Sequence, residues 1–222
     1  QKGKDNEEGD AFLVSSLQAK KSKYSFSQFL KRFSIVKEEM QIDLDEFDLS
    51  YYTYGMSIYK NMPLIEPLET KEVKKIYEFV IVLDTSYSID ENLAKRFISN
   101  TYSILSTSNM FYKSCKVHII QCDDRIRKDD VISNQNEMDR LLNSFSLIGG
   151  GNTDFRPVFS YVNDLINQKV FQNLCGLLYF TDGKGIYPKK SPAYKTAFIY
   201  LEDYDQSKVP SWAIQYRLEE KL

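Results

Sequence analysis

Histidine and cysteine are scarce in this chain. Its 222 residues include one histidine, His118, and three cysteines, Cys115, Cys122 and Cys175. A single histidine excludes a histidine-rich metal centre. Three widely spaced cysteines are typical of small buried hydrophobic residues rather than of a disulfide scaffold. Any chemistry at a functional site therefore falls to carboxylates and hydroxyls.

The chain also lacks a strong excess of charge and a long hydrophobic run. Lys and Arg total 29 against 31 Asp and Glu, a net charge of −2, which gives no support to nucleic-acid binding. No apolar run approaches the roughly 20 residues of a membrane span, and the charged start QKGKDNEEGD is unlike a signal peptide. We therefore expect a fragment of a longer cytoplasmic protein with neither nucleic-acid nor membrane partners.

Aromatic residues are plentiful, at 14% of the chain, and the apolar pattern changes near residue 75. Residues 1–75 are expected to form an N-terminal extension with a frayed start and a short helix through about residue 37. An irregular, aromatic-rich arm over 41–69 is expected to follow. Its aromatic side chains are interpreted as packing on the following domain, and a docking surface is the alternative.

Strand and helix patterns alternate over residues 76–222, the expected domain. Runs rich in β-branched and aromatic residues predict buried strands, and apolar residues at helical intervals predict helices. The predicted strands are 76–83, 115–122, 125–132 at an edge, 174–181, 196–201 and 212–218, and the predicted helices are 91–107, 137–145 and 155–168. Because the strands are too uniformly apolar for a one-sided antiparallel sheet, we expect an α/β fold with a doubly wound, mostly parallel, Rossmann-like sheet.

Three polar stretches lie at predicted strand and helix junctions, where loops leave the carboxyl ends of the strands and ligands bind in such sheets. They are Asp84-Thr85-Ser86-Tyr87-Ser88, Gly149-Gly150-Gly151-Asn152-Thr153-Asp154, and Thr181-Asp182-Gly183. All three offer hard oxygen atoms, and none offers sulfur or imidazole. They favour a hard divalent cation such as Mg²⁺ over Zn²⁺.

The candidate metal site combines hydroxyl ligands with two carboxylates. Ser86, Ser88 and Thr153 are the expected hydroxyl ligands, while Asp84 and Asp182 accept hydrogen bonds from metal-bound waters. Because much of this shell is neutral, the ion keeps positive charge and leaves a position for a partner's carboxylate. Each stretch alone is compatible with an ordinary turn or helix cap, so the prediction depends on their shared placement.

The stretches IVLDTSYSI, GGGNTDF and YFTDG resemble the three loops of a von Willebrand factor A-type (VWA) domain with a metal-ion-dependent adhesion site. The resemblance implies Mg²⁺, or else Mn²⁺ or Ca²⁺, as the bound ion. Tyr87 stands where such domains often have a small residue, which would crowd the rim of the site. By motif, the matching residues are Asp84, Ser86 and Ser88 in the first loop, Thr153 in the second and Asp182 in the third.

More narrowly, DEFDLSYYTYG, NMPLIEP, IIQCD, GGGNTDFRPVF and FTDGKGIYP are similar to a bacterial family of VWA-like proteins associated with MoxR-type AAA ATPases. This resemblance covers roughly residues 24–218. Longer members carry a predicted metallopeptidase-like domain upstream, whose H-E-x-x-H is absent here, so no enzymatic activity is expected. The resemblance implies a cytoplasmic, metal-dependent protein-interaction module that binds an acidic residue of its partner, with a possible role as an adaptor for an AAA ATPase.

Two other functions stay open at this point. One is a Mg²⁺-dependent phosphoryl-transfer hydrolase with Asp84 as nucleophile. Such enzymes place a second carboxylate two residues further on, where this chain has Ser86. The other is a structural subunit with a vestigial metal site.

Several further polar residues have two interpretations. His118 lies in an apolar strand without a triad context and is expected to be packed there. Asp123 and Asp124 either add negative potential beside the metal or form a solvated turn. A small basic rim that steers an acidic partner, or else merely solvated side chains, is expected at Lys184, Lys189 and Lys190.

Overall fold

The computed structural model describes residues 26–87, 89–107, 111–200 and 204–218. Its contacts divide the chain into two compact units. Ser34–Lys75 form one unit, which we call the arm. The described residues before Ser34 and from Ile76 onward form the other, which we call the domain.

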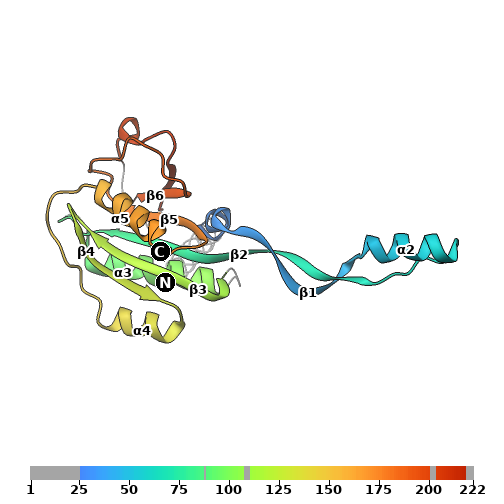
Figure 1. The fold of residues 1–222 in the computed structure, drawn as a ribbon. Helices are drawn as coiled ribbons and strands as arrows, with labels where there is room; N and C mark the ends of the chain where they lie inside the picture. Colours follow the sequence, from blue (N-terminus) through green and yellow to red (C-terminus); the bar gives the residue numbers. More distant parts are fainter. Residues whose placement is uncertain (1–25, 88, 108–110, 201–203, 219–222) are drawn as a thin grey trace, which may run out of the picture. The chain divides into compact units, whose positions relative to one another are not determined.

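Figure 1 labels most elements of both units. The domain begins with a helical turn over residues 26–30 that continues into the 3-10 helix η1 (Lys31–Phe33). The remaining elements of the domain are the second half of β2 (Pro67–Asp84), α3 (Glu91–Thr107), β3 (Phe111–Cys122), β4 (Ile126–Ile132), α4 (Gln135–Asn143), α5 (Arg156–Asn167), β5 (Leu174–Thr181), β6 (Thr196–Tyr200), η2 (Gln206–Lys208) and β7 (Ile214–Arg217).

The central sheet of the domain has the strand order β4-β3-β2-β5-β6-β7. All neighbours pair in parallel except β4, which lies antiparallel at the edge. In the middle of the sheet, Ile81 of β2 aligns with Ile119 of β3 and Leu178 of β5. The predicted doubly wound, mostly parallel α/β fold is thus confirmed. Because the chain continues to β3 on one side of β2 and returns to β5 on the other, the strand order reverses at the carboxyl end of β2.

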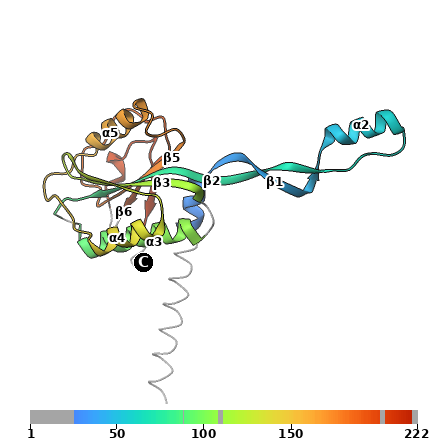
Figure 2. The same ribbon diagram turned by 60° about the horizontal axis from the view of Figure 1, so that its bottom comes forward.

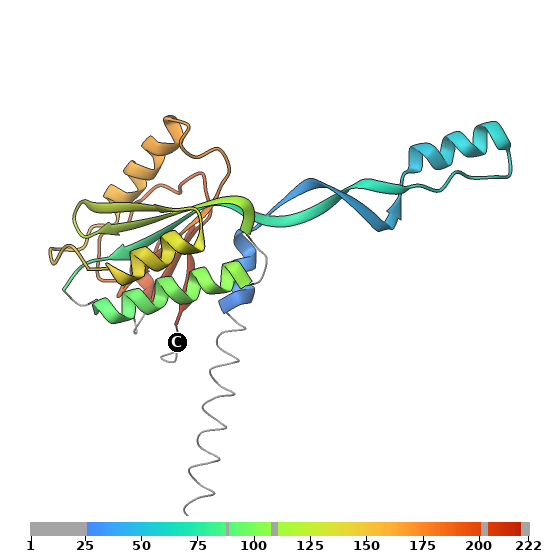
Figure 3. The ribbon, with the colours of Figure 1, turned by 90° about the horizontal axis from the view of Figure 1, so that it is seen from below.

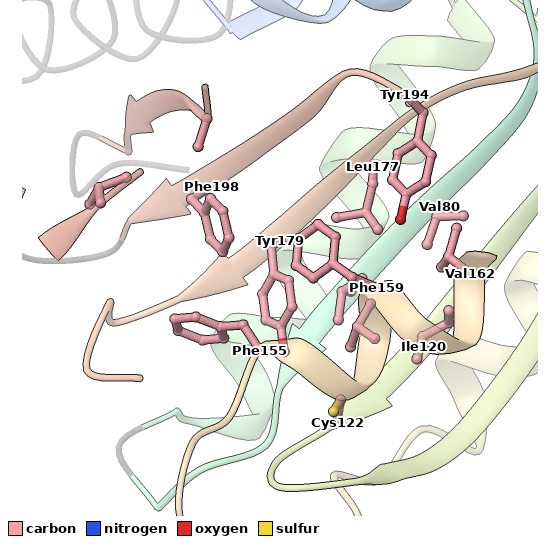
Figure 4. Close-up of a cluster of buried hydrophobic side chains, with 14 of the residues drawn as sticks. Val80, Ile120, Cys122, Phe155, Phe159, Val162, Leu177, Tyr179, Tyr194 and Phe198 are labelled. Atoms are coloured by element: carbon pink, nitrogen blue, oxygen red, sulfur yellow. The ribbon is translucent and has the colours of Figure 1, made fainter. Parts of the chain in front are cut away.

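Helices cover both faces of this sheet. Figures 2 and 3 show α5 on one face and α3 with α4 on the other. Under α5, Phe155 and Phe159 pack with Tyr179 and Phe198 in a buried aromatic cluster, drawn in Figure 4. On the opposite face, Phe97 of α3 stacks on Phe180 of β5 with ring centroids 4.2 Å apart. The uniformly apolar strands follow from this two-sided burial.

The helical segment 26–33 belongs to the core of the domain. Phe26 and Phe33 are fully buried, and Phe33 meets Phe79 of β2 edge-on, with 5.5 Å between ring centroids. The helix expected through about residue 37 ends at Phe33. The β-branched pair Ile35 and Val36 instead begins a strand, because long-range pairing with the start of β2 overrides the local helical spacing.

The arm consists of β1 (Ile35–Phe47), α2 (Leu49–Tyr59) and the beginning of β2, which pairs with β1 antiparallel. Asp48 caps α2, its side chain accepting a hydrogen bond from the backbone N–H of Ser50 at 2.7 Å. The region 41–69, expected to be irregular, therefore contains regular structure. The side chains of Phe47, Tyr51, Tyr54 and Tyr59 are exposed, and their packing on the following domain stays a prediction. No helix in the described part of the chain is both long enough and apolar enough to cross a membrane.

Candidate metal centre

Asp84 is the last residue of β2 and is completely buried. One of its carboxylate oxygens accepts a hydrogen bond from the backbone N–H of Ser86 at 2.9 Å, which shapes the first loop. The other accepts a hydrogen bond from the Thr181 hydroxyl at 2.6 Å. Thr181 ends the neighbouring strand β5, so this carboxylate joins the first and third loops. Ser86 is itself buried, whereas Ser88, the other predicted ligand of this loop, lies outside the described residues.

Asp182 follows β5 directly and brings a second buried carboxylate to the same end of the sheet. One of its oxygens accepts a hydrogen bond from the backbone N–H of Lys184 at 3.0 Å, and the Lys184 ammonium lies 3.3 Å from the other. Burial raises the pKa of Asp84, and the nearby negative charge of Asp182 raises it further, against the hydrogen bonds that stabilise the ionised form. A cation between these two groups would offset both unfavourable effects.

The glycine-rich second loop runs close to the first. A Cβ atom at Gly149 would collide with the hydroxyl of Thr85, so only glycine fits there. Gly150 has a φ of +113°, which favours glycine, and it lies beneath the ring of Tyr87. These two contacts explain why the sequence needs glycine at this point.

The second loop also contacts the third. A Cβ atom at Gly185 would lie 2.7 Å from the Cγ2 of Thr153, which places the predicted hydroxyl ligand Thr153 against the third loop. One residue further on, Asp154 pairs with Ile186 in a parallel bridge. The backbone N–H of Phe155 then donates to the carbonyl of Ile186 at 3.1 Å. All three predicted loops therefore converge at the carboxyl end of β2 and β5.

Asp123 has a role that the sequence did not predict. It is completely buried, and the Arg127 guanidinium binds its two oxygens with contacts of 2.7–3.0 Å. One of these oxygens also accepts a hydrogen bond from the backbone N–H of Gly151 at 3.3 Å. Asp123 therefore ties the turn after β3 to the second loop, while only Asp124 is solvated as a turn residue would be. The D-x-x-x-R spacing of Asp123 and Arg127 after a buried strand is the sequence signal that could have indicated this ion pair.

Gln121 holds the approach to the second loop in a similar way. Its side-chain oxygen accepts a hydrogen bond from the backbone N–H of Ile148 at 2.8 Å, and its side-chain nitrogen donates to the carbonyl of Ser146 at 3.1 Å. Gln121 is almost completely buried, so these bonds satisfy both ends of its amide. This residue, too, was missed, because an isolated glutamine in a strand gives no signal.

The rim of the site carries one large aromatic residue and several charges. Tyr87 is 91% exposed in the first loop, and crowding of the rim by this residue stays a prediction. Arg156 pairs with Asp154 in a bidentate contact, the shortest distance being 2.6 Å. Of the three lysines expected there, Lys184 contacts Asp182.

The donors at this end of the sheet fit a hard divalent cation, since Asp84 and Asp182 supply carboxylates while Ser86 and Thr153 supply hydroxyls. Within the described residues, no group of three or more His, Cys, Asp or Glu side chains converges as a metal site. The predicted ligand set contains two carboxylates, and its other members are hydroxyls. Metal binding here stays a prediction.

The histidine and the cysteines lie elsewhere, in the core. His118 is buried, accompanied by Asp129 at 3.0 Å and by the ring of Phe171, so it is packed as expected. The three cysteines are free and buried, which confirms their interpretation as small hydrophobic residues. Burial raises the pKa of Cys122 to about 12, so its thiol is protonated at neutral pH.

Comparison with known proteins relates this arrangement to one family. A family model described as VWA-like domain (DUF2201) matches residues 79–219. No curated protein matches the chain. Among solved structures, a von Willebrand factor type A protein from Catenulispora acidiphila has 8% identity and a TM-score of 0.46 over 68% of this chain and 40% of that one.

Two further solved structures show likenesses of the same order. The ArnB paralog VWA2 from Sulfolobus acidocaldarius has 15% identity and a TM-score of 0.47 over 85% of this chain and 52% of that one. Proximal thread matrix protein 1 from the mussel byssus has 12% identity and a TM-score of 0.43 over 64% of this chain and 41% of that one. The chain thus spans about half or less of the length of these proteins.

Proposed function

Because the chain belongs to the VWA-like domain family over residues 79–219, we propose that it is a metal-dependent protein-interaction module. Domains of this class commonly mediate protein interactions. In this proposal Asp84, Ser86, Ser88, Thr153 and Asp182 hold a Mg²⁺ ion, and an acidic side chain of the partner completes the site. When bound, the ion supplies a positively charged coordination position for that carboxylate.

The observation that carries the proposal is the buried arrangement around Asp84. Its carboxylate is oriented by Ser86 and Thr181 at the meeting point of two loops, with a second buried carboxylate, Asp182, directly after Thr181. Two buried acidic groups at one end of the sheet are costly unless cations compensate them, and the mostly exposed Lys184 ammonium contacts only Asp182. The third loop and the second are in contact at Gly185, where an added Cβ would lie 2.7 Å from the Cγ2 methyl of Thr153, and this contact supports including Thr153 in the proposed ligand set.

The same geometry supports a binding role rather than hydrolysis. Both oxygens of Asp84 accept hydrogen bonds, and the side chain is completely buried, which restrains it from attacking a phosphate. The residue two positions on is Ser86, which supplies no general acid. We therefore propose that the chain is not an enzyme.

Titration calorimetry with MgCl₂ tests the metal centre. We expect the unmodified chain to bind Mg²⁺ and the Asp84→Asn and Asp182→Asn variants to lose that binding, because each removes one of two negative charges. Asp124→Asn is the matched control, since its half-exposed carboxylate lies on a neighbouring loop. Circular dichroism verifies that the variants fold. Equal Mg²⁺ affinity in all four proteins would rule out this site.

The partner is proposed from the sequence resemblance to proteins associated with MoxR-type AAA ATPases. A pull-down with and without EDTA, analysed by mass spectrometry, tests whether the chain acts as an adaptor for such an ATPase in the cytoplasm. Partners retained only in Mg²⁺ and lost in Asp84→Asn support a metal-bridged contact. Turnover of a phosphate ester that disappears in Asp84→Asn would instead favour the hydrolase.

A further inference from the structure

The arm, Ser34–Lys75, exposes an unusual amount of apolar surface. Thirteen of the eighteen large hydrophobic side chains that are exposed in the described part of the chain belong to it. No apolar side chain of the arm is buried, because the only buried residues in Ser34–Lys75 are Asp43 and Gly55. The exposed side chains are Val36, Met40, Ile42, Leu44, Phe47, Leu49, Tyr51, Tyr54, Met56, Ile58, Tyr59, Met62 and Ile65.

In β1 the usual relation between polarity and burial is reversed. Side chains at alternate positions of a strand point to the same face, and Val36, Met40, Ile42 and Leu44 occupy such positions, with a register irregularity after Met40. All four are exposed, and Met40 is 92% exposed, whereas Asp43 is buried with its carboxylate 3.2 Å from the Lys71 ammonium. An amphipathic strand with its apolar side in water lacks the layer that would cover it.

The helix α2 carries further exposed apolar side chains. None of its eleven residues is charged, and its exposed side chains include Leu49, Tyr51, Tyr54 and Ile58. An open pocket of about 400 Å³ on the helix is lined by Leu49, Ser50, Thr53, Tyr54 and Ser57. A two-stranded ribbon is at best marginally stable in water without further packing, and a concentration of exposed apolar side chains of this kind marks protein-interaction sites.

The charge of the arm decides which partner fits. The whole arm, Ser34–Lys75, has nine acidic residues and five lysines, a net charge of −4. Four of these lysines, Lys37, Lys71, Lys74 and Lys75, lie toward the two ends of the arm's sequence, and within residues 38–69 the single basic residue is Lys60. Against it stand eight acidic residues, Glu38, Glu39, Asp43, Asp45, Glu46, Asp48, Glu66 and Glu69. A second copy of the arm would bring like charges together, and an anionic lipid surface would repel the same acids.

We propose that the arm binds a protein partner whose docking surface combines apolar side chains with lysine and arginine. The apolar side of β1 and the uncharged helix α2 supply the area that is removed from water. The surrounding carboxylates supply complementarity to the basic residues. This contact is made by residues of the arm alone and requires neither a metal ion nor the loops of the domain.

A synthetic amphipathic helix of leucine and lysine serves as the probe, with fluorescence anisotropy as the measurement. We expect the intact chain to bind it, and the triple variant Met40→Ser, Ile42→Ser, Leu44→Ser to bind at least about tenfold more weakly, because each substitution removes apolar contact area. The variant Glu46→Gln, Glu66→Gln, Glu69→Gln tests the charge, and raised sodium chloride should weaken binding to the unmodified chain more than binding to this variant.

The matched control is Val131→Ser with Val170→Ser, which removes two exposed apolar side chains of the domain. It should leave probe binding unchanged, and so should EDTA, which separates this contact from the metal centre. Unchanged binding by the Met40, Ile42 and Leu44 variant would overturn the proposal, as would equal binding of a peptide with glutamate in place of lysine. Two further results would overturn the proposal. One is a dimer of the unmodified chain, seen in sedimentation velocity, that is lost in the Met40, Ile42 and Leu44 variant, and the other is binding of the arm to anionic vesicles.

Discussion

Lys184 is a charged residue outside the predicted ligand set that contacts the candidate metal centre. Its backbone N–H donates to one oxygen of Asp182 and its ammonium lies 3.3 Å from the other. In the absence of metal this contact partly neutralises one of two buried carboxylates. A bound cation and the Lys184 ammonium would therefore compete for the same negative charge.

Lys184→Ala is expected to strengthen Mg²⁺ binding slightly. Because the lysine side chain is 71% exposed, solvent screens its charge, and the gain in affinity should be about two- to fivefold. Titration calorimetry measures this directly. Lys189→Ala provides a control from the same expected basic rim, and weaker Mg²⁺ binding by Lys184→Ala would contradict the competition.

At the scale of elements, the turn between β3 and β4 holds the second loop in place. The buried Asp123 carboxylate accepts hydrogen bonds from Arg127 and from the backbone N–H of Gly151. Burial on its own raises the pKa of Asp123, but the hydrogen bonds from Arg127 and nearby backbone groups outweigh it and hold the pKa well below its usual range. The ionised form therefore contributes stability.

Asp123→Asn should lower the free energy of unfolding by about 2–4 kcal/mol, because it weakens a buried, charge-assisted contact and leaves Arg127 with only the more distant, half-exposed Asp124 as counter-charge. Urea unfolding at neutral pH measures the loss. Since the pKa is lowered by folding, this contribution is present above the unfolded value of about 4 and is lost as the pH falls below it. The difference between Asp123→Asn and the unmodified chain should thus shrink in acid, whereas a constant difference would exclude an ionic origin.

The strands and helices of the domain could be predicted well from the sequence, whereas the contact of Asp123 with the second loop was not predicted. A short, uniformly apolar run such as 174–181 indicates a strand that is buried on both faces, because a strand with one face in water would alternate apolar and polar residues. Asp84 and Asp182 could be predicted as ligands because each stands at the end of a predicted strand. The register of β2 and β5 brings these two strand ends to the same edge of the sheet. The D-x-x-x-R spacing could have signalled the contact between Asp123 and Arg127, but not the bonds from Asp123 to Gly151 and from Gln121 to Ile148. Those partners lie 28 and 27 residues away, and only tertiary structure brings them together.

At the scale of the whole molecule, the chain divides its apolar residues between two uses. Phe26, Leu30 and Phe33 precede the arm in sequence but are buried in the domain. The apolar residues of the arm itself remain exposed. Periodicity alone cannot separate these uses, because β1 has the alternation of a half-buried strand and yet exposes its apolar side. The interpretation of 41–69 as packing on the following domain therefore stays a prediction.

Two substitutions should show the contrast. Phe33→Ala is expected to lower the free energy of unfolding by about 3–5 kcal/mol, because Phe33 is fully buried against Phe79 and its loss leaves a cavity. Leu44→Ser, at a side chain that is 85% exposed, should change it by less than about 0.5 kcal/mol. Both are measured by urea unfolding of the intact chain. A large loss in Leu44→Ser would mean that the arm is covered within the chain itself.

One strand, β2, passes through both units. It begins at Pro67 in the arm, where it pairs with β1, and ends at Asp84, where the first loop starts. Between these points its second half is bonded to β3 on one side and β5 on the other. Because the strand is uninterrupted, the paired segment of the arm and the strand that carries Asp84 are one continuous length of backbone. Mechanical tension applied by a bound partner would reach Asp84 through a single covalent path.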